Sequence, residues 1–175
     1  MTYEYAAYFR LLLLCGYEDE LQQYINNALI EQDPLTDIIL SLSTAGGDKK
    51  IILSVLNEYL RKVKDSDINY NKTVFDLVMS FLKKIYQDDL LSKKAMAELM
   101  YHLALYTERY LEEPWSTMYY MGDLFDEAEA GYIDKEDFLL KFEAFINNKT
   151  LFGDYPPIFP KENLFKRLLR KIHGK

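Results

Sequence analysis

The sequence predicts an all-α fold, either an irregular helical bundle or stacked helix pairs, with about eight or nine helices and little or no sheet. Apolar residues recur at spacings of three and four along most of the chain, and short turn signals interrupt them. No stretch alternates convincingly between apolar and polar residues between hairpin turns. The 175 residues, 49% hydrophobic and 28% charged, fit one globular domain over 1–175.

Two helices are predicted at the start of the chain. They cover about residues 2–15 and 18–32, and Gly16 between them is typical of a residue that ends a helix. The second carries an apolar stripe at helical spacing, made of Leu21, Tyr24, Ile25, Ala28 and Leu29. Because the connection is short, we expect the two helices to pack as antiparallel neighbours.

A third and a fourth helix follow. Asp33 and Pro34 suggest an N-cap and a first-turn proline for a short helix that ends near Thr44. Gly46 and Gly47 break this helix, and Asp48 caps the next. The fourth helix has the clearest amphipathic stripe of the chain: Ile51, Ile52, Val55, Leu56, Tyr59, Leu60 and Val63.

The fifth and sixth helices are predicted after a polar stretch at residues 64–72. The inner face of the fifth consists of Val74, Leu77, Val78, Phe81, Leu82 and Ile85. Ser92 caps the long sixth helix, which is expected to continue to Tyr110.

The seventh helix is predicted from Glu113-Pro114 to Gly131, and Asp134 caps the eighth. The eighth has an inner face of Phe138, Phe142, Phe145 and Ile146. Residues 153–160 form a proline-rich connector to a basic amphipathic C-terminal helix that reaches about residue 173. We expect this last helix to dock its apolar side on the acidic body, although such helices also bind membranes or nucleic acid.

The net charge of −7 is unevenly distributed along the chain. Residues 161–175 hold six basic side chains against Glu162, a net of +5, so the first 160 residues carry −12. An acidic body repels nucleic acid and attracts basic proteins. We therefore expect a basic protein partner, and neither nucleic acid nor membrane; the oligomeric state stays open.

The only cysteine, Cys15, cannot form an intramolecular disulfide, and a buried thiol is typical of a reducing compartment. The apolar run before it does not fit a lipoprotein signal, because Arg10 interrupts it and bulky Leu14 precedes the cysteine. No run of 18 apolar residues that could span a membrane occurs. A cytoplasmic protein is expected. The chain lacks the common phosphate-loop, serine-elbow and zinc motifs, so we predict no catalytic residue, metal or cofactor.

Acidic and aromatic residues are concentrated between Glu108 and Asp137. Ten acidic side chains face only Arg109 and Lys135 in this stretch, a net of −8. Aromatic anchors surrounded by charge of one sign favour a rapidly associating protein interface. The predicted partner-binding residues are Glu112, Glu113, Trp115, Tyr119, Tyr120, Asp123, Asp126 and Glu127. The same residues would also make an ordinary solvated helix face with Trp115 in the core.

Two arrangements would instead suggest an enzyme or a metal protein. Residues 126–137 resemble an EF-hand calcium loop that starts at Asp126, but Ala128 and Ala130 replace two of its oxygen ligands. A helix that ends at Gly131, followed by a new helix capped by Asp134, explains the stretch without metal. Glu98 and His102 are four residues apart on the sixth helix and could share a face, without the spacing of carboxylate-bridged metal bundles.

Two stretches of the chain resemble the small helical immunity proteins of bacterial polymorphic toxin systems. The stretches are residues 33–43, and Trp115 to Asp123 together with Ala128, Gly131, Asp134, Phe138, Phe142 and Phe145. The resemblance covers less than a third of the chain and implies a cytoplasmic inhibitor of one cognate toxin. We therefore expect a protein-binding module, possibly of this immunity type, and keep the enzyme or metal protein as the alternative.

Overall fold

The computed structural model describes residues 1–154 and confirms the all-α fold, with eight α-helices and no strand among these residues. The helices are α1 (Tyr3–Leu14), α2 (Asp19–Glu31), α3 (Asp37–Thr44), α4 (Lys49–Leu60), α5 (Phe75–Gln87), α6 (Lys93–Tyr106), α7 (Trp115–Glu129) and α8 (Lys135–Asn148). Three short turns accompany them: η1 (Asp65–Asp67), the π-helical η2 (Tyr70–Val74) and η3 (Phe152–Asp154). The predicted basic C-terminal helix and most of its connector lie outside the described residues.

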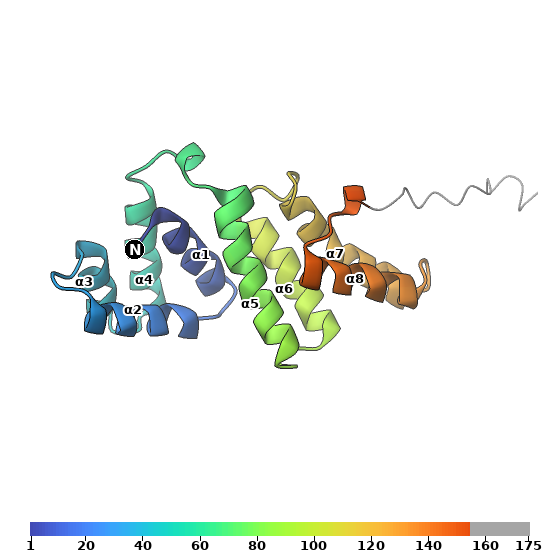
Figure 1. Cartoon of the computed structure of the whole chain (residues 1–175), viewed down its shortest axis with the longest axis horizontal. Coiled ribbons are helices and arrows are strands. Elements are labelled where there is room, and N and C mark those ends of the chain that lie inside the picture. Colours follow the sequence, from blue (N-terminus) through green and yellow to red (C-terminus); the bar gives the residue numbers. More distant parts are fainter. Residues whose placement is uncertain (155–175) are drawn as a thin grey trace, which may run out of the picture.

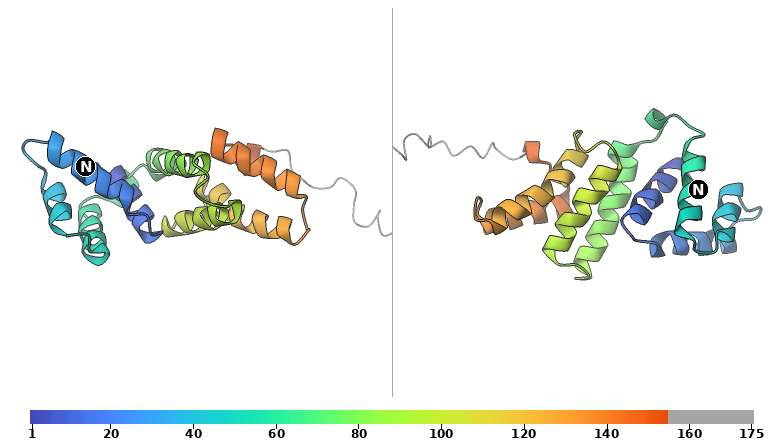
Figure 2. Two further views of the ribbon diagram at one scale, coloured as in Figure 1. Left: turned by 90° about the horizontal axis from the view of Figure 1, so that it is seen from below. Right: turned by 180° about the vertical axis from the view of Figure 1, so that it is seen from behind.

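The helices form an elongated row (Figure 1). The helices α1–α4 occupy one end, α5 and α6 the middle, and α7 and α8 the other end. Seen from below, α5 and α8 lie in one layer and α6 and α7 in a second (Figure 2), and α5 contacts α8 while α6 contacts α7. This arrangement agrees with stacked helix pairs.

The helix α1 connects the two halves of the row. It packs against α4 on one side and against η2, α5 and α6 on the other. Seven of its twelve residues are buried: Ala6, Ala7, Tyr8, Phe9, Leu11, Leu12 and Leu13. A helix that is apolar on nearly every side has to be covered on nearly every side, and this requirement places α1 at the junction.

Three predicted helix caps are confirmed. The side chain of Asp48 accepts hydrogen bonds from the backbone N–H groups of Lys50 and Ile51, at 2.8 and 3.2 Å. Ser92 caps α6 and Asp134 caps α8 in the same way. Each cap satisfies backbone donors that the first helical turn leaves without a partner.

The predicted start of α3 is wrong. The helix begins at Asp37, after an extended Thr36, and not at Asp33-Pro34. Its buried residues are Ile38, Ile39 and Leu42, so the helix begins where the apolar spacing begins and not at the proline.

Two predicted helix ends are also too late. The helix α4 ends at Leu60, before the half-buried Val63. The helix α6 ends at Tyr106, and Glu108 adopts a left-handed φ of 60° that no α-helix continues through.

The confirmed and rejected caps can be compared directly. We expect Asp48→Ala to lower the free energy of unfolding by about 1 kcal/mol, because two N–H groups of α4 lose their acceptor. Asp33→Ala, which removes an exposed aspartate that caps no helix, should change it by less than about 0.5 kcal/mol. Urea denaturation followed by circular dichroism measures both variants. Equal losses in the two would contradict this assignment of caps.

Candidate functional site

Five of the predicted partner-binding residues lie together on the outer side of α7: Tyr119, Tyr120, Asp123, Asp126 and Glu127. We call this surface the α7 face. Its three carboxylates are exposed, Tyr120 is 42% exposed and Tyr119 is half-buried. No lysine or arginine occurs within α7. The face therefore combines aromatic rings with negative charge of one sign.

Neighbouring rings hold the tyrosines of the α7 face in place. The ring of Tyr119 lies 4.7 Å from that of Tyr101 on α6, 5.1 Å from Tyr110 and 5.3 Å from Tyr120, measured between centroids. The Tyr101 hydroxyl raises the pKa of Tyr119 to about 12, with added contributions from loss of solvent and from the Asp123 carboxylate. Tyr119 is thus a neutral phenol at physiological pH, and the charge of the face comes from its carboxylates.

Glu112 and Glu113 precede α7 and take part in contacts within the protein. Glu112 forms an ion pair with Arg109 at 3.5 Å. The carboxylate of Glu113 accepts hydrogen bonds from the backbone N–H of Thr117, at 3.3 Å, and from its hydroxyl, at 2.8 Å. Both residues are exposed, but their carboxylates are less free than those of the α7 face.

Thr117 connects this end of α7 to the end of the described chain. It is fully buried, and its hydroxyl, which donates to Glu113, also accepts a hydrogen bond from the backbone N–H of Phe152 at 3.0 Å. A buried hydroxyl that both donates and accepts a hydrogen bond contributes to stability, because its loss would leave two partners unsatisfied.

Trp115 is a correction to the predicted site. Its side chain has no solvent exposure, so it is not available to a partner, and the alternative that places it in the core is confirmed. The indole N–H donates to Asn71 Oδ1 at 3.2 Å, and the indole and Phe75 rings are perpendicular, with their centroids 5.2 Å apart. Trp115 thus contacts α5 through Phe75 and η2 through Asn71. A buried indole N–H needs a hydrogen-bond acceptor, and Asn71 supplies it.

The loop-like stretch at Asp126 is part of two capped helices. Asp126 lies within α7 and cannot begin a calcium loop there. Gly131 has a φ of 76°, and the N–H groups of Gly131 and Tyr132 donate to the carbonyls of Ala128 and Glu127, at 3.2 and 2.8 Å. This is the Schellman pattern that ends a helix, and the helix end predicted at Gly131 is confirmed.

Within residues 1–154, Glu98 and His102 belong to no group of side chains that could hold a metal ion. Glu98 and His102 are both exposed on α6, where Glu98 lies 3.8 Å from Lys94 and the His102 ring lies against Tyr101 and Tyr106. Within residues 1–154 no group of three or more His, Cys, Asp or Glu side chains could hold a metal ion. Burial raises the pKa of the Cys15 thiol to about 12, which makes it a poor nucleophile at neutral pH.

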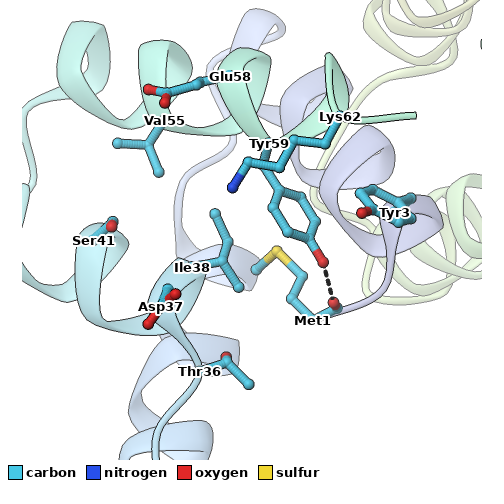
Figure 3. A pocket seen from close by; sticks show the side chains of 10 residues that line it. All are labelled: Met1, Tyr3, Thr36, Asp37, Ile38, Ser41, Val55, Glu58, Tyr59 and Lys62. Atoms are coloured by element: carbon cyan, nitrogen blue, oxygen red, sulfur yellow. Dashed lines mark hydrogen bonds between the residues drawn. The ribbon is translucent and has the colours of Figure 1, made fainter. Parts of the chain in front are cut away.

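A hollow of about 380 Å³ lies between α3 and α4 at the start of the chain (Figure 3). Tyr59 crosses it from α4, and its hydroxyl donates to the carbonyl oxygen of Met1 at 2.8 Å. Ile38 and Val55 line the hollow from α3 and α4, with Glu58 beside them. Its ten lining residues include no histidine or cysteine, so neither an imidazole nor a thiol faces the hollow.

Comparison with protein families, curated proteins and solved structures finds no match. Among the described residues, no helix is both long and apolar enough to cross a membrane.

The position of Trp115 predicts the fluorescence of the folded protein. Because Trp115 is the only tryptophan and is fully buried, iodide should quench its emission far less in the folded protein than in the urea-unfolded chain. Stern–Volmer plots in the two states measure the difference. Similar slopes would place the indole at the surface and contradict the structure.

The hydroxyl of Thr117 can be tested for its contribution to stability. Thr117→Val keeps the shape of the side chain and should lower the free energy of unfolding by about 1–3 kcal/mol, because Glu113 and the Phe152 N–H lose a partner. The matched control is Ser116→Ala, on the neighbouring half-buried residue, which should change it by less than about 0.5 kcal/mol. A Thr117→Val variant as stable as its control in urea would rule out the bridging role.

Proposed function

We propose that this protein is a protein-binding module, and specifically an immunity-type inhibitor that neutralises a basic toxin in the cytoplasm through the α7 face. The observation that carries the proposal is the combination on one helix face of three exposed carboxylates with tyrosines held by ring packing. The proposal also rests on the resemblance to immunity proteins of toxin systems, one stretch of which, Trp115 to Asp123, includes part of the α7 face.

The charge of the α7 face suits the capture of a basic surface. Asp123, Asp126 and Glu127 are exposed and form no ion pair with any residue between 1 and 154. Carboxylates without an ion-pair partner attract a basic protein over a distance and accelerate association. Salt screens this attraction.

The tyrosines supply the contact that holds a bound partner. Tyr120 is exposed, and its ring is in contact with Tyr119, which in turn packs on Tyr101. A ring that is already fixed loses little conformational freedom on binding, and tyrosines are frequent among the residues that dominate binding energy.

The binding partner for the test is a basic protein captured from the native cell by this protein immobilised on a resin, or the product of an adjacent gene. At low salt, the triple variant Asp123→Asn, Asp126→Asn and Glu127→Gln should associate roughly tenfold more slowly than the unchanged protein. Tyr120→Ala should instead speed dissociation, since it removes contact area and not charge. Surface plasmon resonance at several salt concentrations measures both rates.

A matched control removes the same number of charges elsewhere. Glu18→Gln, Asp19→Asn and Glu31→Gln neutralise three exposed acidic residues of the α2 region and should leave the association rate close to that of the unchanged protein. An association rate that does not depend on salt, or an equal loss in both triple variants, would reject the α7 face as the binding surface.

A further inference from the structure

All three arginines of the described chain line one pocket. The pocket has a volume of about 550 Å³, and Arg10, Arg61 and Arg109 reach it from α1, from the end of α4 and from the loop between α6 and α7. The lysines of residues 1–154 all lie outside its lining. Arginine differs from lysine in its planar fork of N–H donors, which matches the oxygens of phosphate and carboxylate groups.

Arg109 forms one wall of this pocket and is neutralised within the protein. It pairs with Asp65 and, at 3.5 Å, with Glu112, and its guanidinium lies 4.9 Å from the centre of the Tyr70 ring. Burial raises the pKa of Tyr70, and the nearby Arg10 and Arg109 partly oppose that shift. Arg10 lines the same pocket as Tyr70 and Arg109.

Arg10 and Arg61 keep free donors. The Nε–H of Arg10 donates to Asn57 Oδ1 at 2.8 Å, which fixes the guanidinium and leaves its two terminal amino groups for another acceptor. Arg61 is exposed at the C-terminal end of α4. Neither arginine forms an ion pair with any other residue in the described part of the chain.

We infer that this pocket binds the phosphate or carboxylate group of a small molecule between Arg10 and Arg61. The lining has three carboxylates, on Asp65, Glu108 and Glu112, for its three arginines, so its net charge is zero and it does not suit a polyanion. Asp65 and Glu112 pair with Arg109, and the unpaired donors of Arg10 and Arg61 are those left for a single anionic group. Glu112 is the one predicted partner-binding residue in the pocket lining, and no residue of the α7 face lines the pocket. It therefore adds a small-molecule site to the proposed protein interface.

The first experiment titrates the intact protein with sodium phosphate and, separately, with sodium acetate, each against sodium chloride of equal ionic strength. Amide signals in a nitrogen–proton correlation spectrum report where the anion binds. Saturable shifts confined to the segments that line the pocket, around residue 10, residues 57–70 and residues 107–112, are expected for at least one of the two anions. The anion that saturates at lower concentration identifies the ligand as a phosphate or a carboxylate. Shifts no larger than those with chloride, or spread over the lysines of the surface, would overturn the inference.

A matched pair of variants just after α4 separates specific binding from general attraction. Arg61→Gln should weaken binding of the anion about tenfold, the loss expected for a charge-assisted hydrogen bond. Lys62→Gln removes one positive charge from the next residue, which lines the hollow between α3 and α4 and not this pocket, and should leave the affinity unchanged. Equal effects of the two variants would reject the site. Because Arg61 is exposed and unpaired within residues 1–154, its replacement should not unfold the protein, and circular dichroism checks this.

Discussion

The need to cover α1 on almost every side organises the structure. Three leucines in a row, Leu11 to Leu13, have no exposed surface, and the preceding turn contributes Ala6 and Ala7. No single neighbour can cover such a helix, so α4 packs on one side and η2, α5 and α6 on the other. The two halves of the chain are thereby held together, and the same junction brings Arg10 of α1 close to residues from α4 and from the α6–α7 loop.

The second half depends on an aromatic contact between α5, α7 and α8. Phe75 lies against both Trp115 and Phe145, with ring centroids 5.2 and 6.2 Å away. Once Trp115 is fixed in this contact and bonded to Asn71, the rotation of α7 about its axis is set. Met118 and Met121 are then buried, and Asp123 and Glu127, on roughly the opposite side of the helix from these two methionines, face the solvent. Burial of the tryptophan and exposure of the acidic residues are two results of one packing arrangement.

Local chemistry was predictable from the sequence, and long-range assembly was not. Capping by Asp48 and Asp134 depends on residues next to the helix start, so the sequence predicts it well. Asp33-Pro34 has a similar local pattern, but the buried apolar residues of α3 begin only at Ile38. The packing of these residues determines where the helix begins. The position of Trp115 stayed open because only the fold shows that α5 and η2 cover it. The pocket of arginines could not be predicted, because about fifty residues separate each of its arginines from the next along the chain.

The elongated row of helices implies that resistance to local opening varies along the molecule. The helix α2 at one end buries only Leu21, Ile25 and Ala28, so its detachment exposes little apolar surface. Detachment of α1 would uncover the contacts of both halves at once. Regions with few buried contacts open with the smallest free energies. Amide hydrogens should therefore exchange faster in α2 than in α1, and the junction formed by α1 should open after the helix at the end.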